Sequence, residues 1–508
     1  MICVTIACGS HTRMIAEHQR LAEKGIKLVE LRADFLRREP DWKRLIPSRP
    51  TATVITIRRQ QDGGLWRDTE EKRLSLLRAA IAEGPEFIDL EVDVASKIPP
   101  FGNTRRIISY HNTETMPENL EGLYREMSAQ KPHLIKIAVS PETIEDMCLF
   151  LNFIQKKNIA TKKLLGDKGI RVVGICMGEM GKAARILSKR FDMPYTYATF
   201  SEDRIIAPGM LVYHDLLDLY HYDQINQQTA VYTIIGNPLG HSLSPLVHNR
   251  SFLAQKINAV YVPFPLEDFN VAELMHRAST FGIQGASVTI PHKVAVIKFL
   301  TKMDPAVEKI GACNTVVFRQ GERIGYNTDY MAAMSGIELA LGGQPADEVS
   351  VLDGKTALVL GAGGAGRALG YGLARRKARV TVTDIDADRS VELAQHIGGD
   401  YLTWDMRESI QADILVNCTP IGMHPNVNET PYSRSLIRSS TLVFDAIYNP
   451  EHTLLIKSAQ DKGCKVVTGV EMFVGQACLQ FKLFTGQKTS ASEMRTLVKE
   501  AILKMNQR

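Results

Sequence analysis

The segment "HLIKIAV", residues 133–139, has the composition of a buried β-strand, yet it carries Lys136 near its centre. Burial of an ammonium group costs free energy unless the group is paired or its pKa falls. A desolvated lysine among other cations loses its proton near neutral pH and becomes a nucleophile that forms a Schiff base with a carbonyl carbon. Lys136 is therefore a candidate catalytic amine.

Further ionisable side chains stand late in, or just after, neighbouring apolar runs. His111 is a candidate general acid and base, because its unperturbed pKa of ~6.5 lets it take and return a proton. Arginines at the same place could hold an anionic substrate, most simply a carboxylate. Each residue taken singly has a structural explanation, but six charges gathered at one rim would carry a large desolvation cost without a function. The set comprises Glu30, Arg32, Arg58, Glu91, His111 and Lys136, with Arg185 following in "MGEMGKAAR".

The elements that must position this set are eight short β-rich runs within residues 1–200: "ICVTI", "KLVELR", "TATVITIR", "FIDLEV", "RRIISYH", "LIKIAV", "RVVGICM" and "PYTYATF". Between them lie segments with apolar residues at three- and four-residue spacing that end in glycine, as helices do. Alternating strands and helices predict a parallel (β/α)₈ TIM barrel, whose active site forms at the C-terminal ends of the strands.

The order of "VELRAD", "ITIR", "DLEVD", "SYHN", "LIKIAV" and "MGEMGKAAR" resembles the type I 3-dehydroquinate dehydratases over about residues 1–215. The resemblance implies that Lys136 forms an imine with the substrate ketone and that His111 transfers protons while water is lost. It further implies substrate contacts from Glu30, Arg32, Arg58 and Arg185, with Thr5 as a weaker contact.

Three positions depart from that family. The usual "SAPGQ" near the end of the barrel is "IAPGM" here, so Ile206 and Met210 replace two hydrogen-bonding residues. Asp62 stands where a lid glutamate is common, and Asn112 stands where aspartate is common. We expect a weaker or differently closed lid over the substrate.

The second half begins with a loop, "GNPLGHSLSPLVHN", rich in hydroxyl groups, glycine and proline. Ser242 and Ser244 could bind a small polar ligand, or Ser244 could simply cap the helix that Pro245 begins. Lys293 and Asp329 could form a proton relay or a plain surface ion pair. Other hydrogen-bonding groups that could converge with them are Thr289, Asn314 and Asn327.

The strongest local signal is "KTALVLGAGGAGRALGYGLARRKARVTVTDID", an apolar strand that runs into a glycine-rich turn, a helix and a second strand. This pattern predicts a dinucleotide-binding βαβ unit, in which backbone N–H groups approach the pyrophosphate. Asp384 ends the second strand, where an acidic side chain takes the ribose 2′-hydroxyl of NAD and would repel a 2′-phosphate. The turn consists of Gly361, Ala362, Gly363, Gly364, Ala365 and Gly366.

The segments "GHSLSP", "VTIPHK", "GACNT", "YNTDY", "GAGGAG", "NCTPIGM", "IYNP" and "GVEMFVGQ" resemble shikimate dehydrogenase over about residues 230–505. The resemblance implies that Lys293 with Asp329 handles the proton and that Ala446 and Gly469 border the cofactor. It implies shikimate contacts from Ser242, Ser244, Thr289, Asn314, Asp329, Tyr448 and Gln476. Ser287 replaces a common asparagine, and Cys418 is read as a core residue.

The family more often has "NRT" after the second strand of the Rossmann domain and uses NADP, whereas this chain has Asp384, Ile385 and Asp386. The resemblance therefore predicts NADP and the local charge predicts NAD. We expect three domains: a dehydratase barrel (1–222), a substrate-binding domain (229–335, completed by 476–508) and a Rossmann cofactor domain (336–475).

Together the two halves predict a bifunctional shikimate-pathway enzyme of aromatic amino-acid biosynthesis that dehydrates 3-dehydroquinate and then reduces 3-dehydroshikimate to shikimate. Two alternatives are a catabolic quinate or shikimate dehydrogenase fusion that uses NAD, and a non-enzymatic sensor.

The formal charge of +5 is spread along the chain, which argues against nucleic-acid binding. No apolar run reaches the ~20 residues of a membrane span. The start of the chain turns polar too soon for a signal peptide, and eight scattered cysteines fit a reduced cytoplasm without structural zinc. We expect no metal, and we expect the small molecules 3-dehydroquinate, 3-dehydroshikimate and shikimate as the partners.

Overall fold

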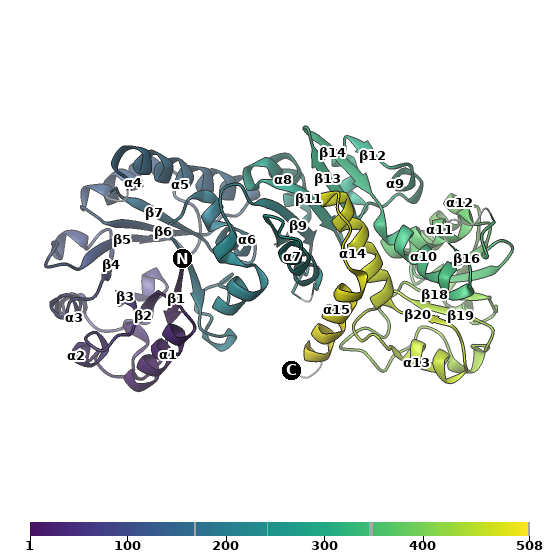
Figure 1. Cartoon of the computed structure of the whole chain (residues 1–508), viewed down its shortest axis with the longest axis horizontal. Helices are drawn as coiled ribbons and strands as arrows, with labels where there is room; N and C mark the ends of the chain where they lie inside the picture. Colours follow the sequence, from purple (N-terminus) through teal and green to yellow (C-terminus); the bar gives the residue numbers. More distant parts are fainter. Residues whose placement is uncertain (167–168, 241, 345–348, 506–508) are drawn as a thin grey trace. The chain divides into compact units, whose positions relative to one another are not determined.

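The computed structural model of the chain describes residues 1–166, 169–240, 242–344 and 349–505 (Figure 1). Its contacts divide the chain into two compact units. One comprises Met1–Val231 and Ile257–Ile283, and the other comprises Tyr232–Lys256 and Gln284–Arg508. Among the described helices, none is long and apolar enough to cross a membrane.

The first unit contains an eight-stranded parallel sheet in the order β7-β6-β5-β4-β3-β2-β1-β8, which confirms the predicted barrel. Each predicted run contains one strand, and "LIKIAV" coincides with β6. Strand β3 ends at Thr56, so Arg58 lies two residues beyond it rather than at its end. The strands are β1 (Ile2–Ile6), β2 (Leu28–Arg32), β3 (Ala52–Thr56), β4 (Phe87–Glu91), β5 (Arg105–His111), β6 (Leu134–Val139), β7 (Arg171–Cys176) and β8 (Thr196–Thr199).

The barrel interior is layered because side chains alternate along each strand. One layer is a buried apolar cluster that includes Cys3, Leu28, Val54, Ile107 and Leu134. Two residues further along the same strands, closer to their C-terminal ends, stand Thr5, Glu30, Thr56, Ser109 and Lys136, all buried. The sheet register therefore places Lys136 opposite Ser109 of β5 and Thr5 opposite Glu30 of β2.

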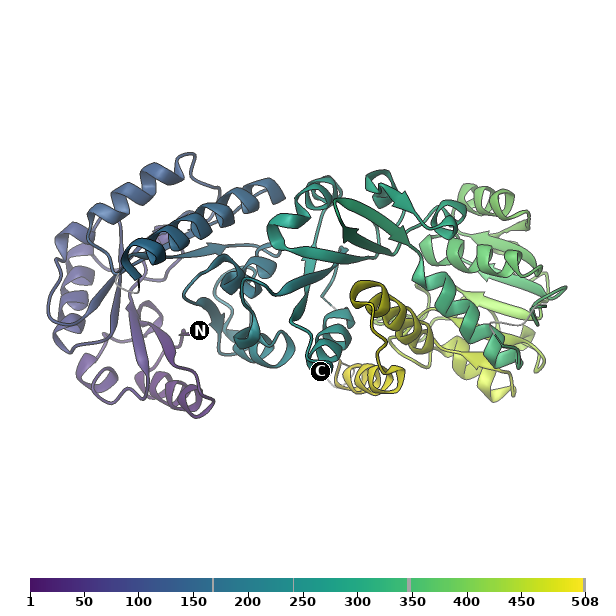
Figure 2. The same ribbon diagram turned by 45° about the horizontal axis from the view of Figure 1, so that its top comes forward.

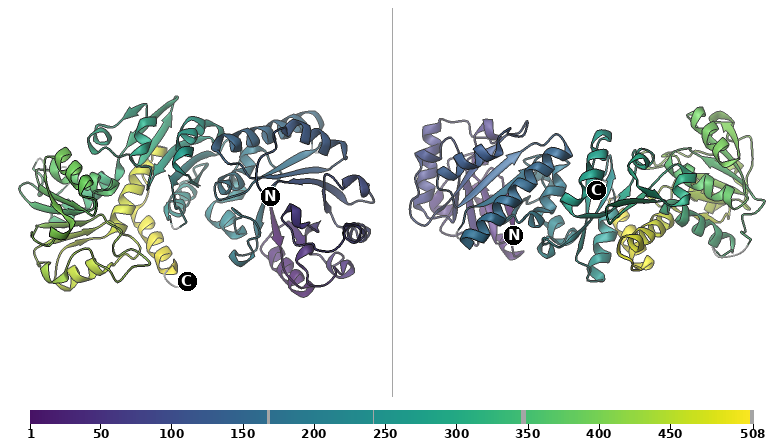
Figure 3. Two further views of the ribbon diagram at one scale, coloured as in Figure 1. Left: turned by 180° about the vertical axis from the view of Figure 1, so that it is seen from behind. Right: turned by 90° about the horizontal axis from the view of Figure 1, so that it is seen from above.

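Helices surround this sheet (Figure 3). Ser10, Thr69 and Asn119 each cap a helix by accepting a backbone N–H, and Thr143 with Asp146 forms a capping box. A short π-helical turn, Asp215–Leu219, follows β8. The helices are α1 (His11–Glu23), α2 (Trp42–Leu45), α3 (Glu70–Ala82), α4 (Leu120–Ala129), α5 (Ile144–Leu165) and α6 (Gly181–Ile186).

A second sheet has the order β10-β9-β11-β13-β14-β12. Its strands are β9 (Ala230–Gly236), β10 (Ala259–Pro265), β11 (Ile283–Val288), β12 (Lys302–Met303), β13 (Thr315–Arg319) and β14 (Glu322–Tyr326). Strands β11, β13 and β14 pair antiparallel, and β12 pairs parallel with β14. The helices in this part of the sequence are α7 (Ser244–Ala254), α8 (Asp268–Phe281), α9 (Pro305–Ile310) and α10 (Thr328–Leu341).

A third sheet is wholly parallel, with the order β17-β16-β15-β18-β19-β20. This is the strand order of a dinucleotide-binding Rossmann domain, and the predicted fold class is therefore confirmed. The strands are β15 (Thr356–Leu360), β16 (Arg379–Asp384), β17 (Asp400–Thr403), β18 (Ile414–Asn417), β19 (Leu442–Asp445) and β20 (Val466–Val467). The helices are α11 (Gly364–Arg375), α12 (Ala387–Ile397) and α13 (Leu454–Asp461).

Two C-terminal helices, α14 (Gly469–Thr485) and α15 (Ala491–Met505), lie beside each other (Figure 2, yellow). Gln480 of α14 donates to Thr315 Oγ1 at 2.9 Å, and Thr489, before α15, donates to Ser251 Oγ at 3.0 Å. The end of the chain is thus hydrogen-bonded to β13 and α7, segments that precede it by more than 160 residues.

Candidate active sites

A pocket of about 410 Å³ opens at the C-terminal ends of the barrel strands. All seven barrel residues that the resemblance singled out line it: Thr5, Glu30, Arg32, Arg58, His111, Lys136 and Arg185. The parallel sheet explains this convergence, because the carboxyl ends of its strands meet at one edge. The lid positions Asp62, Ile206 and Met210 also line the pocket.

Lys136 lies at the floor of this pocket with its side chain 6% exposed. Its Nζ is 3.1 Å from Asp89 Oδ2 and 3.3 Å from Glu30 Oε1, and it stands 4.4 Å from the centre of the Tyr197 ring. The expectation that cations surround this lysine was therefore incomplete, since two carboxylates contact it directly. The amine of Lys136 is held between the two carboxylates and the face of the Tyr197 ring, which fixes its position within the pocket.

Hydrogen bonds hold these two carboxylates in place. Glu30 accepts from Thr5 Oγ1 at 2.9 Å and from Thr56 Oγ1 at 3.0 Å. Asp89 accepts from Ser109 Oγ at 2.6 Å and lies 2.7 Å from an Arg58 nitrogen. The pKa of Asp89 is lowered by Arg58 and Lys136 although burial acts in the opposite direction. Asp89 therefore stays a carboxylate.

His111 ends β5, the strand that pairs with β6. Burial, the Arg58 guanidinium and Lys136 together lower the pKa of His111 well below 6.5. Its Nδ1 is buried and has no hydrogen-bond partner among the described residues. A neutral imidazole with a free ring nitrogen is able to accept a proton.

The three predicted arginines differ in their partners. Arg32 donates twice to Asp34, at 2.8 and 2.9 Å, and Arg58 is engaged with Glu91 and Asp89. Arg185 is 4% exposed and, within the described part of the chain, forms no ion pair. Burial lowers the pKa of Arg185 to about 10. Among these three arginines, Arg185 is therefore the one that forms no ion pair with another described residue, and the substrate contacts of all three stay predictions.

The remaining barrel positions have local structural roles. Glu91 accepts from Arg58 and Arg73 and does not line the pocket. Asn112 accepts the backbone N–H groups of Glu114 and Thr115, so it shapes a loop. Asp62 is paired with Arg59 at 2.6 Å.

Sequence reasoning missed Asp89 and Tyr197 in this pocket region. The signal was present, because Asp89 lies two residues before Glu91 and so shares its face of β4. Tyr197 of β8 packs edge-to-face against Tyr195, which directly precedes that strand, and both rings are buried. Met210 belongs to the apolar cluster that contains these tyrosines, and Ile206 packs against it.

The second site is built around Lys293 and Asp329, whose side chains form an ion pair at 2.6 Å. Both side chains are largely buried, at 17% and 9% exposed, which excludes the plain surface ion pair considered from the sequence. A Cβ atom added to Gly364 would lie 3.0 Å from Lys293 Cδ. The ion pair therefore lies directly against the glycine-rich turn of the Rossmann domain.

Polar residues near this pair are positioned by their own hydrogen bonds. Asn314 accepts the N–H of Thr328 at 2.8 Å and donates to its hydroxyl at 2.9 Å, and Asn327 caps α10. Ser242 accepts the N–H of Ser244 at 3.4 Å. Ser244 is the first residue of α7, and no side-chain cap is formed there, so the capping interpretation of Ser244 was wrong. Thr289 follows β11, with its N–H bonded to the Ile235 carbonyl.

Tyr448 lies in the loop after β19, and Gln476 lies in the middle of α14. The Tyr448 ring is 5.2 Å from Phe473, and Gln476 donates to the Phe473 carbonyl at 3.0 Å. Burial raises the pKa of Tyr448. A Cβ atom at Gly469 would meet the carbonyls of Ile447 and Ala446, so only glycine allows this close approach.

The glycine-rich turn has the geometry that a dinucleotide pyrophosphate requires. Gly361 has φ of +98°, and a Cβ at Gly366 would lie 1.8 Å from the Gly361 carbonyl oxygen. Helix α11 begins at Gly364, so its free N–H groups face the turn. Asp384 accepts the N–H of Ala362 at 2.6 Å and that of Asp386 at 2.9 Å, which fixes its carboxylate beside the turn.

Asp445, at the end of β19, is a buried carboxyl group that sequence reasoning missed. It accepts from Asn417, Thr453 and the N–H of Ile447, and it therefore orders the loop that contains Ala446. Burial raises its pKa to about 6.

Among the described residues, no group of three or more His, Cys, Asp or Glu side chains is arranged to hold a metal ion.

Models of known families match successive parts of the chain. The type I 3-dehydroquinase family matches residues 2–227, the shikimate dehydrogenase substrate binding domain matches 234–316, and the shikimate 5′-dehydrogenase C-terminal domain matches 469–499. The chain is similar to a bifunctional 3-dehydroquinate dehydratase/shikimate dehydrogenase of Arabidopsis thaliana, named as chloroplastic. Identity is 36%, over 96% of this chain and 82% of the relative.

The second half alone has further relatives. It is 38% identical to a shikimate dehydrogenase (NADP(+)) of Bacillus cereus, over 54% of this chain and 98% of that protein. A crystal structure of a shikimate dehydrogenase in complex with NADP⁺ covers 55% of this chain and 97% of its own, with 32% identity and a TM-score of 0.51.

Proposed function

We propose a sequence of two reactions for this chain, which belongs to the family of bifunctional 3-dehydroquinate dehydratase/shikimate dehydrogenases. The barrel dehydrates 3-dehydroquinate to 3-dehydroshikimate, and the second half reduces that ketone to shikimate. The observation that carries the proposal is one pocket at the barrel rim that is lined by the amine of Lys136, by His111 and by Arg185, whose guanidinium forms no ion pair with the described residues.

In the barrel, the ammonium group of Lys136 first gives one proton to solvent. The neutral Nζ then attacks the ketone carbon, and its two remaining protons leave with the ketone oxygen as water to form an imine. The imine draws electrons from the neighbouring carbon, so its C–H proton is removed by neutral His111. The hydroxyl on the next carbon takes a proton back and leaves as the second water, which creates the C=C bond. Hydrolysis of the imine consumes one water and frees Lys136. Arg185 holds the substrate carboxylate, while Glu30 and Asp89 hold the amine.

In the second site, Lys293 and Asp329 act on the oxygen of the 3-dehydroshikimate ketone. A nicotinamide cofactor supplies hydride to the carbonyl carbon when it is bound at the glycine-rich turn. Lys293 donates the proton that the developing alkoxide needs, and Asp329 at 2.6 Å orients the ammonium group. Ser242, Ser244, Thr289, Asn314, Tyr448 and Gln476 are the proposed contacts to the substrate, and Ala446 and Gly469 border the cofactor.

For the cofactor we propose NAD(H) rather than NADP(H). The Bacillus cereus relative is named for NADP(+), but here the carboxylate of Asp384 ends β16 beside the turn, and Ile385 next to it is 86% exposed. Asp384 would accept a hydrogen bond from a ribose hydroxyl and would repel a 2′-phosphate. Arg389, a cation close by in sequence, is paired with Asp386 at 3.1 Å.

The two alternatives are not favoured. Neither curated relative above is named as a quinate dehydrogenase or as a sensor. A cytoplasmic location stays a prediction for this chain.

Cofactor oxidation in the presence of each substrate tests the proposal. The full chain with NADH should consume the cofactor when it is given 3-dehydroshikimate, and also when it is given 3-dehydroquinate, which must first be dehydrated. Borohydride should trap the substrate covalently on Lys136. Lys136→Ala should abolish NADH oxidation with 3-dehydroquinate and leave NADH oxidation with 3-dehydroshikimate unchanged. Lys293→Ala should abolish NADH oxidation with both substrates and leave the dehydration of 3-dehydroquinate intact.

The two variants serve as matched controls for each other, because each leaves the other site unchanged. Consumption of 3-dehydroshikimate without consumption of 3-dehydroquinate would refute the barrel assignment. Trapping that persists in Lys136→Ala would refute the imine.

A further inference from the structure

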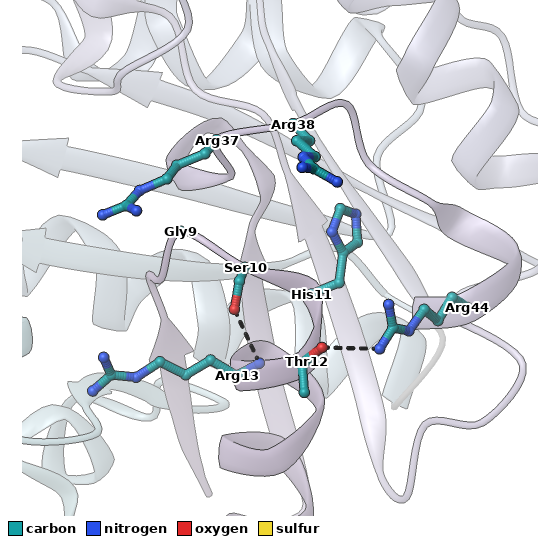
Figure 4. Close-up of a pocket in the computed structure, with 8 residues that line it drawn as sticks. All are labelled: Gly9, Ser10, His11, Thr12, Arg13, Arg37, Arg38 and Arg44. Atoms are coloured by element: carbon teal, nitrogen blue, oxygen red, sulfur yellow. Dashed lines mark hydrogen bonds between the residues drawn. The ribbon is translucent and has the colours of Figure 1, made fainter.

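A second pocket of about 420 Å³ lies at the barrel rim, formed by the loop after β1, the first turn of α1, the loop after β2 and α2. It shares no lining residue with the pocket around Lys136. The lining residues are Gly9, Ser10, His11, Thr12, Arg13, Arg37, Arg38 and Arg44, with no carboxylate among them (Figure 4).

Three of the four arginines in this pocket lack an acidic partner. Within the described part of the chain, the guanidinium groups of Arg37, Arg38 and Arg44 form no ion pair, although Arg44 donates to Thr12 Oγ1 at 2.9 Å. Arg13 is paired with Glu17 at 3.0 Å. Like charges that gather without counter-ions repel one another, so an anion in this pocket would relieve that repulsion.

The acidic residues of the same loop are engaged elsewhere. Glu39 pairs with Lys72 at 2.5 Å, and Asp41 accepts the backbone N–H of Arg44 at 3.2 Å. Asp41 also donates its own N–H to His11 Nε2 at 2.9 Å. With Nε2 as the acceptor, the proton of a neutral His11 ring is on Nδ1, which makes that nitrogen a donor.

The first turn of α1 adds to the positive charge around this pocket. No acidic residue stands in that turn, and Ser10 caps it by accepting the N–H of Arg13 at 3.3 Å. The first N–H groups of a helix have no intrahelical partner and carry the positive end of its dipole. Figure 4 shows Arg38 and Arg44 on either side of His11, and Arg37 with Arg13 on the side of Gly9 and Ser10.

We propose that this pocket binds the phosphate group of a small molecule. Three unpaired guanidinium groups, one imidazole and two hydroxyls offer more donors than the two oxygens of a carboxylate can accept, and they match the several oxygens and double charge of a phosphate. The site is separate from the two proposed reactions and does not depend on them. Its position at the rim of the barrel makes a bound phosphate compound a neighbour of the dehydratase pocket.

Binding of inorganic phosphate and of methyl phosphate to the full chain, measured by calorimetry at low ionic strength, tests the site. Both probes should bind saturably, and the double variant Arg37→Ala/Arg38→Ala should weaken binding at least about tenfold, because it removes two charge-assisted contacts. Arg20→Ala, on the exposed face of the same helix, is the matched control and should bind as the unmodified chain does. Arg185→Met should also keep the site, because Arg185 belongs to the other pocket.

The pattern of results decides the proposal. Binding of inorganic phosphate alone would identify the free ion as the ligand, and binding of both probes would identify a phosphate group on an organic molecule. Absence of saturable binding, equal binding in the double variant, or an equal loss in Arg20→Ala would overturn the site. These readouts are binding constants, so failure of the proposed enzyme function would leave them unchanged.

Discussion

Asp89 Oδ2 lies 3.1 Å from the amine of Lys136, while the other oxygen of the same carboxylate lies 2.7 Å from Arg58. One buried anion thus holds both the proposed nucleophile and a neighbouring cation. Removal of its charge would leave two buried cations with fewer partners, which is costly.

Asp89→Asn keeps the shape of the side chain and removes that charge. We expect the kcat of dehydration to fall about 100-fold, because Lys136 would lose its fixed position. The measurement is the rate of 3-dehydroshikimate formation, with reduction of 3-dehydroshikimate as the control for folding. Asp68→Asn, at an exposed aspartate, should leave both rates unchanged. A normal kcat in Asp89→Asn would show that the ion pair has no part in dehydration.

The pH dependence of dehydration should report the environment of His111. Its pKa is lowered, so the imidazole stays neutral as the pH falls through 6.5, and the base is lost only at lower pH. The kcat/KM for 3-dehydroquinate should therefore show no decline attributable to His111 between pH 8 and pH 6. His111→Asn should lower kcat by about 10² to 10⁴-fold. A decline centred near 6.5 that vanishes in this variant would contradict the lowered pKa.

Arg185→Met should weaken the binding of 3-dehydroquinate and at the same time raise the thermal stability of the chain. The guanidinium is buried and forms no ion pair with the residues that the structure describes, so an uncharged, flexible side chain in its place should raise the Tm of the chain. The same change should raise the KM for 3-dehydroquinate about 100-fold through loss of the contact to the carboxylate. Arg171→Met, which removes a paired arginine outside the pocket, is the control and should leave KM unchanged. An unchanged KM in Arg185→Met would exclude this residue from substrate binding.

Cofactor choice should respond to the residues after β16. The double change Asp384→Asn and Ile385→Arg removes a negative charge and adds a guanidinium. It should shift the ratio of kcat/KM for NADPH to that for NADH by about 100-fold or more toward NADPH. Asp388→Asn removes one negative charge in the first turn of α12, as Asp384→Asn does after β16, and should have a smaller effect. A preference for NADPH in the unmodified chain would contradict the proposal.

Asp445→Asn tests the cost of a buried carboxylate. Its pKa of about 6 in the folded chain lies above the ~3.9 of an unfolded aspartate. Its contribution to stability is therefore fully present below pH ~3.9 and is lost as the pH rises through about 6. The variant should be more stable than the unmodified chain at pH 8, by up to about 3 kcal/mol, and should show little difference at pH 4. Thermal unfolding at the two pH values measures this, and an equal difference at both would contradict the assigned pKa.

The sequence alone predicted the barrel and the Rossmann domain, because each rests on a local pattern. Short apolar runs between amphipathic segments can pack only as alternating strands and helices, and a glycine-rich turn after a strand serves a dinucleotide. The positions of Glu30 and Lys136 late in their strands also predicted that both lie at one rim of the barrel.

Only the tertiary structure decided which charges meet. The strand ends and the family resemblance predicted that all three arginines contact the substrate. The fold pairs Arg32 with Asp34 and Arg58 with Asp89, and it leaves Arg185 without an ion pair to any described residue. It also placed Asp89 against Lys136, although the two residues are 47 positions apart. The strand pattern tells which face a side chain takes, but a pairing across strands depends on barrel closure and on side-chain packing, which no local pattern encodes.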